Sequence, residues 1–429
     1  MSYQCDKTTR DMLCDLLYQR MPPEAIAQSA VQDRLRTRAH VKAHLRQILV
    51  SGAVPRVAEH NFDDAVEDLI QTLLGYGPID ELLEDEQVTE VMVNGPDQVF
   101  FERDGKLFRY DRSFSDEEAL RGVIDRIISP LGRRIDEQTP IVNARLKEGH
   151  RVHAIIPPLA LDGPILTIRK FRSQIYTLTE LVELDSLPAW LAQMLRWMVA
   201  ARLNIAVTGG TGSGKTTLLN ALSLEVGHGE RIITIEDSAE LKFHAHPHVV
   251  RLEARAPNIE GFGEITIRDL VITSLRMRPD RIVVGEVRGG EALEMLQAMN
   301  TGHDGSLTTV HANSPFELVA RLITMVNYIS AMATDQITTQ IGAALDIVIH
   351  QARMSDGSRR VTSVCEVSQD EQKGCALREI VRFEQVGLSA DDRVQGMTKL
   401  CHTPQFVSQL TSRGIATPEE VASWARQIP

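Results

Sequence analysis

Cysteine is scarce in this 429-residue chain, and its few cysteines are not arranged in recognisable pairs. There are 5 of them, an odd number, and no two have C-x-x-C spacing. This pattern argues against a disulfide framework and against a cysteine-based zinc module. We therefore expect reduced thiols in a cytosolic protein.

Long apolar runs are also missing. The N-terminal stretch MSYQCDKTTRDMLCDLL has no basic segment followed by an apolar core, so we expect no signal peptide. The most apolar stretch, LPAWLAQMLRWMVAARLNIAV, is interrupted by Gln193, Arg196, Arg202 and Asn204, and it fails as a membrane span. The sequence thus predicts a cytoplasmic protein whose membrane contact, if it has any, is peripheral.

A basic block, the usual mark of a nucleic-acid binder, is absent as well. The chain has 46 Lys and Arg residues against 58 Asp and Glu residues, which gives a formal net charge of -12. Because nucleic-acid binders usually carry a basic stripe, we expect no nucleic acid as the main substrate. The hydrophobic fraction of 43% and the charged fraction of 24% are typical of a globular protein.

The order of sequence patterns predicts several domains. Residues 1–60 have apolar side chains at helical spacing and predict a helical N-terminal appendage. Residues 61–175 combine helices with short strand-like runs and an Asp-Gly hairpin signal, which predicts an α+β domain. After a linker at 176–188, residues 189–365 alternate β runs with helices, a pattern typical of an α/β domain with a mainly parallel sheet. Residues 366–429 predict a C-terminal extension of a strand or two and terminal helices.

The strongest motif is a phosphate-binding loop in NIAVTGGTGSGKTTLLNAL, which fits G-x-x-x-x-G-K-[ST] between a β run and a helix. The glycines allow backbone N–H groups to surround phosphate oxygens, Lys215 can reach the β- and γ-phosphates, and the Thr216 hydroxyl can ligate Mg²⁺. The flanking elements argue against an accidental glycine-rich turn. The predicted nucleotide-binding residues are Gly209, Gly210, Thr211, Gly212, Ser213, Gly214, Lys215, Thr216 and Thr217.

Two acidic motifs narrow the choice among kinase, switch GTPase and motor. RIITIEDSAEL places Glu236, Asp237 and Glu240 at the end of a β run, and DRIVVGEV places Glu286 at the end of another. Such carboxylates lie on the phosphate side of an open sheet, and Glu286 stands where a Walker B acid would hold Mg²⁺ or its water. No N-K-x-D guanine reader is present, which disfavours a GTPase. For any single acid, a solvated strand end is the alternative interpretation.

These motifs stand in the same order as in a known family. Together with GRRIDEQTP, HRVHAIIPPLALDGPILTIRKF and TGHDGSLTTVHANSP, they resemble the type II/type IV secretion and pilus ATPases over roughly residues 70 to 390. The resemblance is greatest to the CpaF-type tight-adherence pilus assembly ATPases. It implies a PAS-like α+β domain followed by a RecA-like P-loop NTPase motor domain. It also implies a ring of six subunits, with ATP bound between the two domains.

The resemblance assigns roles to individual residues. Lys215 and Thr216 correspond to the Walker A pair, Glu286 to the Walker B acid, and Glu240 to the general base of the Asp box beside Glu236 and Asp237. His303 and His311 correspond to the His-box pair. Their loop follows a predicted helix and precedes SLTTVH, so we expect it near the γ-phosphate, where an imidazole can report the bound nucleotide. Plain loop packing is the alternative, and zinc would need further ligands.

A basic set in the α+β domain also acquires a candidate role. Family precedent places some of its arginines at the nucleotide, and guanidinium groups suit polyphosphate. For any one of these arginines, a surface salt bridge is an equally good interpretation. The candidates are Arg145, Arg151, Arg169 and Arg172, with Arg133 and Arg134 nearby.

The predicted function is therefore an ATP-hydrolysing, Mg²⁺-dependent ring motor at the cytoplasmic face of the inner membrane. Such a homo-hexamer would power assembly of tight-adherence or type IV-like pili, or type II-type secretion, with an inner-membrane platform protein as its partner. The alternatives are a nucleotide-gated scaffold with little turnover and a DNA-translocating, conjugation-type ATPase. A small-molecule kinase fits poorly, because the sequence has no lid segment.

Overall fold

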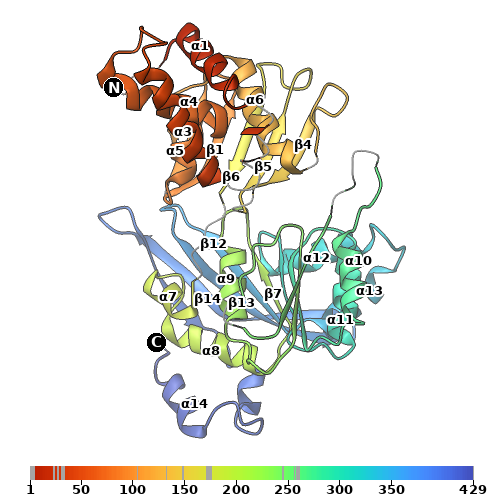
Figure 1. Cartoon of the computed structure of the whole chain (residues 1–429). Coiled ribbons are helices and arrows are strands. Elements are labelled where there is room, and N and C mark those ends of the chain that lie inside the picture. The colour runs from red at the N-terminus through yellow and green to blue at the C-terminus, as the bar shows by residue number, and fades with distance from the viewer. Residues whose placement is uncertain are drawn as a thin grey trace. The chain divides into compact units, whose positions relative to one another are not determined.

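The computed structural model describes residues 5–428, apart from 23–24, 27–28, 30–33, 104, 132, 147–148, 171–175, 244–245, 256 and 258–260 (Figure 1). The chain divides into two compact units, Met1–Arg172 and Ser173–Pro429. Among the residues so described, no helix has the length and apolar character needed to cross a membrane.

The first unit begins with a small helical bundle, which confirms the predicted N-terminal helical region. Helices α1 (Lys7–Tyr18), α3 (Arg34–Val50) and α4 (Phe62–Leu74) share an apolar core of their own. Helix α4 lies beyond the predicted boundary at residue 60, yet its apolar side belongs to this core. The members of the core from α1, α3 and α4 include Leu13, Leu17, Leu45, Ile48, Val66 and Leu69.

The rest of the first unit is an antiparallel sheet with one helix-covered face, as predicted for a PAS-like α+β domain. Its strand order is β3-β2-β1-β6-β5-β4. Helix α6 (Glu117–Ile128) packs Leu120, Val123 and Ile124 into the core of this sheet. The short helix α5 spans Asp80–Glu84, and the strands are β1 (Val88–Asn94), β2 (Val99–Arg103), β3 (Lys106–Arg109), β4 (Ile141–Arg145), β5 (Arg151–Ile155) and β6 (Ile165–Arg169).

The second unit is built on a sheet of order β15-β14-β13-β12-β7-β11-β10-β8-β9. The strands from β12 to β9 in this order are parallel, which confirms the predicted α/β fold of the RecA-like P-loop type. Because they are parallel, their carboxyl ends meet at one edge of the sheet. These strands are β7 (Ile205–Thr208), β8 (Ile232–Glu236), β9 (Val249–Glu253), β10 (Arg281–Val287), β11 (Leu307–Val310) and β12 (Ile347–Arg353).

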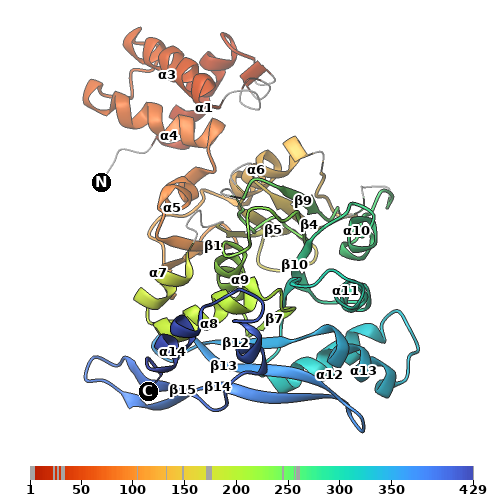
Figure 2. The same ribbon diagram turned by 90° about the horizontal axis from the view of Figure 1, so that it is seen from below.

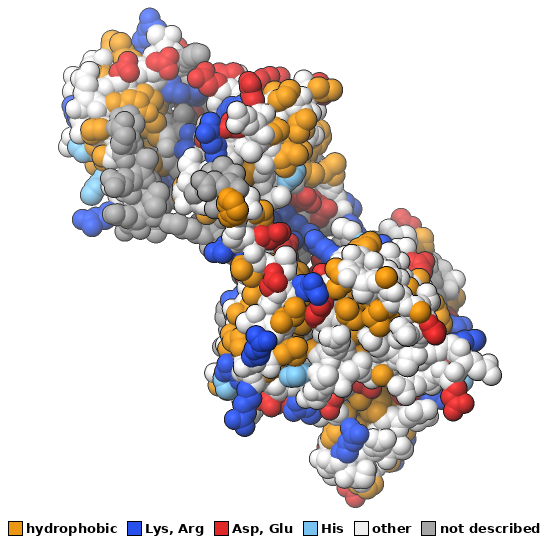
Figure 3. All heavy atoms as spheres, turned by 90° about the vertical axis from the view of Figure 1, so that its right-hand side faces the viewer, with side chains coloured by type: hydrophobic (Ala, Val, Ile, Leu, Met, Phe, Trp, Pro, Cys, Tyr) orange, Lys and Arg blue, Asp and Glu red, His pale blue; other side chains and the backbone are white. Residues whose placement is uncertain are grey.

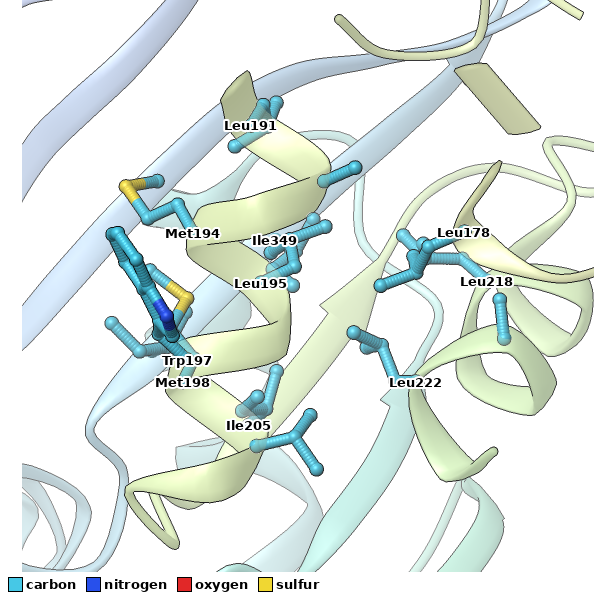
Figure 4. Close-up of a cluster of buried hydrophobic side chains, with 14 of the residues drawn as sticks. Leu178, Leu191, Met194, Leu195, Trp197, Met198, Ile205, Leu218, Leu222 and Ile349 are labelled. Carbon is cyan, nitrogen blue, oxygen red and sulfur yellow. The ribbon is translucent and has the colours of Figure 1, made fainter. Parts of the chain in front are cut away.

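Helices cover both faces of this sheet. On one face, α7 (Leu178–Glu183), α8 (Ala189–Ala200) and α9 (Lys215–Ser223) share a core with the strands; Figure 4 shows Leu195, Leu222 and Ile349 within it. On the other face, a second core is filled from four further helices. Those helices are α10 (Ile267–Ser274), α11 (Glu291–Asn300), α12 (Pro315–Val326) and α13 (Thr334–Ala344). The predicted linker at 176–188 contains α7.

The C-terminal residues continue the same sheet with antiparallel strands, the blue end of the molecule in Figure 2. There are three of them, β13 (Arg359–Asp370), β14 (Gly374–Leu388) and β15 (Val394–Leu400), where the sequence predicted a strand or two. Strand β13 runs through the predicted boundary at 365/366. Helix α14 (Pro418–Ala425) returns to α8, where the Trp424 indole N–H donates to the Trp190 carbonyl over 2.8 Å.

Candidate active site

The phosphate-loop motif forms a tight loop between β7 and α9. Gly209 and Gly214 have φ of 156° and 94°, and a methyl group on Gly209 would lie only 2.2 Å from the Gln351 carbonyl oxygen. Only glycine fits such a position. Within the described part of the chain, the first turn of α9 has no side-chain cap at Gly214, which leaves its backbone N–H groups available at the loop. The predicted residues Gly209, Gly210, Thr211, Gly212, Ser213 and Gly214 form the loop, and Lys215, Thr216 and Thr217 begin α9.

The Lys215 side chain turns back onto the backbone of this loop, and the Ser213 side chain is buried in it. The Lys215 ammonium donates to the carbonyl oxygens of Gly209 at 2.9 Å and Gly210 at 3.0 Å. The buried Ser213 hydroxyl has no hydrogen-bond partner within the described part of the chain. Thr216, the residue after Lys215, is half-buried. Amide N–H groups, an ammonium and two hydroxyls around one loop are the chemistry that binds a polyphosphate.

Glu236 ends β8 and is buried, with 3% of its surface exposed. One carboxylate oxygen accepts the backbone N–H groups of Glu240 at 2.6 Å and Leu241 at 2.8 Å. Burial raises the pKa of Glu236 to about 7. Room for this side chain exists because residue 285 on the neighbouring β10 is glycine; a methyl group there would lie 2.9 Å from Glu236 Cγ. Glu236 thus shapes the turn that positions Glu240.

The other three predicted acids gather around one cation, Arg288. Its guanidinium donates to the Glu286 carboxylate, and this bond raises the pKa of Arg288; the charges of Asp237 and Glu240 add to the shift. The structure therefore brings Asp237, Glu240 and Glu286 together. Arg288 was missed in the sequence analysis. The only available signal was its position two residues after the Walker B acid.

Strand pairing relates these acids to the phosphate loop. Ile235 of β8 is level with Val284 of β10, Val287 of β10 with Val310 of β11, and Val310 with Thr208 of β7. The residues next to these paired positions therefore lie at the carboxyl edge of the sheet. Along that edge stand Glu236, Glu286, His311 and Gly209.

His350 of β12 extends this edge on the far side of β7 and was also missed. It is level with Thr208, whose hydroxyl lies 2.9 Å from its Nδ1. Burial lowers the pKa of His350, which keeps the ring neutral at pH 7. No sequence pattern marked this residue, because it stands in an otherwise ordinary β run.

The two predicted His-box residues do not lie together, which corrects the expectation for His303. His311 directly follows β11 at the phosphate edge. His303 precedes β11 at the opposite edge, and its Nδ1 lies 3.2 Å from the Ala298 carbonyl oxygen near the end of α11. Since β11 is 4 residues long, about 13 Å of strand separates the two edges. The pair cannot share a zinc ion or a phosphate.

Buried polar groups hold the His303 loop at that far edge. The Asn204 side-chain oxygen accepts the N–H groups of Gly305 at 2.9 Å and Ser306 at 3.0 Å. Arg281, with 1% of its surface exposed, pairs with Glu230 and donates to the Gly305 carbonyl oxygen. The histidine loop is thus anchored by contacts that have nothing to do with the phosphate loop.

This separation predicts different effects for the two histidines. His311→Ala should lower ATP turnover about tenfold or more with little change in nucleotide affinity, since it removes a polar group beside the loop. His303→Ala should leave turnover near the parent value and reduce the free energy of unfolding by about 1 kcal/mol, the value of one hydrogen bond. Phosphate release and thermal unfolding measure the two effects. An equal loss of turnover in both variants, at unchanged stability, would contradict this assignment.

The predicted arginines belong to the first unit, and most of them form a row. Arg145 of β4 is level with Arg151 of β5, and Arg151 is level with Arg169 of β6. Side chains of residues paired in this way emerge on the same face of a sheet. Arg172 lies outside the described residues. Arg133 donates to the Asn143 carbonyl oxygen, and Arg134 pairs with Asp136.

The sequence matches a known protein family over most of its length. A model of the family described as "Type II/IV secretion system protein" matches residues 72–419. A protein of Mycobacterium tuberculosis named "Putative conjugal transfer protein" is 40% identical over 310 residues, covering 71% of this chain and 88% of its own length. Conjugal transfer protein TrbB of Rhizobium radiobacter is 33% identical over 290 residues, covering 66% and 85%. The crystal structure of the VirB11 ATPase of the Brucella suis type IV secretion system, with sulphate, is 30% identical, with coverage of 67% and 95% and a TM-score of 0.38.

Proposed function

The chain belongs to the type II/IV secretion system protein family, and from that premise we propose that it is an ATP-hydrolysing ring motor for pilus assembly or secretion. The observation that carries the proposal is the gathering of Lys215, Glu240 and Glu286 in one unit. A phosphate loop and acids that can activate water meet there at one sheet edge. A scaffold that only binds nucleotide has no need of such acids.

Each group has a distinct task in this proposal. The loop amides and Lys215 bind the phosphates, with the Lys215 ammonium exchanging the carbonyl oxygens of Gly209 and Gly210 for phosphate oxygens. Glu240 accepts the proton of the attacking water. Arg288 holds Glu286 and reduces the repulsion among the three carboxylates.

Magnesium fits the oxygen donors that the site offers. The Thr216 hydroxyl and, through a water, the Glu286 carboxylate would hold it, because Mg²⁺ prefers hard oxygen ligands and keeps several waters. When bound, Mg²⁺ neutralises charge on the phosphates. ATP and Mg²⁺ are thus the cofactors of the proposed reaction.

The assembly and its location are part of the same proposal. We propose a homo-hexamer in which arginines of the first unit, Arg145, Arg151 and Arg169, complete the nucleotide site. The ring would act in the cytoplasm, against an inner-membrane platform protein of the secretion or pilus machine. Within the family, the tight-adherence branch is our specific proposal, supported by the segment-by-segment resemblance and by the absence of a C-x-x-C zinc module from the sequence.

A conjugation-type motor is the second candidate, and the names of the two curated relatives favour it. Those names concern conjugal transfer, a process that involves DNA. Against it stands the net charge of -12. On the face of the molecule in Figure 3, Lys and Arg side chains are interspersed with Asp and Glu side chains. Electrostatic binding of DNA would favour a continuous basic surface.

Phosphate release by the purified chain, with ATP and Mg²⁺, tests the motor against the scaffold. We expect steady turnover that chelation of Mg²⁺ abolishes and that added single- or double-stranded DNA does not change. Binding of ATP without turnover would support the scaffold. Stimulation of turnover by DNA, lost at raised salt, would move the conjugation-type motor ahead.

A further inference from the structure

The hairpin formed by β12 and β13 places two arginines beside the phosphate loop. Arg353 is the last residue of β12 and Arg359 the first of β13, and the two are paired directly across the strands. Paired residues present their side chains on the same face of a sheet. Both are exposed. No motif in the sequence indicated these residues.

Contacts with the loop glycines define the position of the two guanidinium groups. The Arg359 Nε donates to the Gly212 carbonyl oxygen over 3.0 Å, and its Cδ would lie 3.1 Å from a methyl group on Gly214. A methyl group on Gly212 would lie 3.8 Å from a terminal nitrogen of Arg353. The hairpin therefore adjoins the same backbone that is shaped to surround phosphate oxygens.

Gln351, two residues before Arg353 on the same face, continues this polar edge toward the loop. It has 1% of its surface exposed, and its side-chain nitrogen would lie 3.2 Å from a methyl group on Gly214. Its side-chain oxygen is buried without a hydrogen-bond partner in the described part of the chain. One side of the phosphate loop is thus lined by three polar side chains, those of Gln351, Arg353 and Arg359, which we call the polar wall.

Strand order determines which end of a nucleotide meets this wall. The acids that would activate water stand on or just after β8 and β10, and β7 with its loop separates them from β12 and β13. A nucleotide whose terminal phosphate points toward Glu286 must therefore extend its nucleoside end toward the hairpin. We infer that Arg353 and Arg359 bind the α-phosphate, the phosphate nearest the nucleoside. This inference rests on the proposed function, and the planar donor fork of arginine suits such an oxyanion.

Nucleotide affinities of hairpin variants test the inference. Arg353→Gln and Arg359→Gln should each weaken binding about tenfold, and by the same factor for ADP and for a non-hydrolysable ATP analogue, because both share the α-phosphate. The dependence of affinity on salt should also become shallower. Calorimetric titration measures these quantities. The matched control is Arg382→Gln, an exposed arginine of β14 that pairs with Glu379, and its affinity should equal that of the parent.

Two results would overturn the inference. Unchanged nucleotide affinity in both hairpin variants would show that the two arginines do not contact the nucleotide. A loss of affinity confined to the ATP analogue would place them at the γ-phosphate instead of the α-phosphate. Thermal unfolding separates phosphate binding from support of Gly212: weaker affinity in an Arg359→Gln variant of parent stability indicates a phosphate contact, and weaker affinity with a lowered melting temperature indicates a structural one. Titration does not depend on turnover. A parent that binds nucleotide without hydrolysing it would contradict the proposed function, while the variant affinities would still decide the role of the hairpin.

Discussion

Lys215→Ala should abolish measurable ATP turnover and weaken nucleotide binding. The Lys215 ammonium lies in the first turn of α9 and donates to the carbonyl oxygens of Gly209 at 2.9 Å and Gly210 at 3.0 Å. Its loss removes charge-assisted hydrogen bonds to phosphate oxygens, each worth about 1.5–3 kcal/mol. Loss of one such stabilising donor typically costs about 100- to 1,000-fold in rate. We expect that decrease in turnover and about 10- to 100-fold weaker ATP binding.

The control for this variant is Lys399→Ala. Lys399 lies on β15 and pairs with Glu384 on the surface, so its removal should cost less than about 1 kcal/mol of stability and no activity. Phosphate release, nucleotide titration and thermal unfolding are measured on both variants and the parent. Turnover by a stably folded Lys215→Ala variant within about tenfold of the parent would contradict the assigned role of the loop.

The phosphate loop and its acids were predictable because their geometry depends on short-range patterns. Gly209 and Gly214 need backbone angles that favour glycine, and this requirement appears directly in the sequence. Glu236 and Glu286 end or nearly end two β runs, and parallel strands bring their carboxyl ends to one edge whatever the strand order. Local sequence therefore sufficed for this half of the site.

The other half depends on strand order and loop direction, which no local pattern encodes. His303 and His311 are close in sequence, but a whole strand runs between them, so proximity along the chain predicted the wrong edge for His303. Arg353 and Arg359 meet the phosphate loop only because β12 pairs with β7. Likewise, Trp424 packs against α8 because the chain folds back there, and the sequence of its short helix does not indicate this contact. Each depends on contacts between residues far apart in the sequence.

Glu286→Gln and Glu240→Gln should produce proteins that bind ATP but barely hydrolyse it. Glutamine keeps the shape of each side chain and removes its negative charge. In the first variant the Arg288 guanidinium keeps an acceptor but loses its ionic partner, and water and Mg²⁺ lose the carboxylate that orients them. In the second the water loses its proton acceptor, and loss of a positioned base typically costs about 100- to 10,000-fold in rate. ATP affinity should stay within a factor of about three, because reduced repulsion between carboxylate and phosphate offsets the lost contacts.

Steady-state phosphate release beside a nucleotide titration separates these effects, with Glu384→Gln as the matched control on the exposed β14–β15 surface. Glu236→Gln gives a further contrast. Glu236 accepts two backbone N–H groups and has its pKa raised to about 7 by burial, so glutamine should preserve the turn and reduce turnover far less than Glu240→Gln does. If Glu286→Gln instead hydrolyses ATP at nearly the parent rate, the acids at this sheet edge do not serve hydrolysis. The group that activates water would then have to be another residue of the chain.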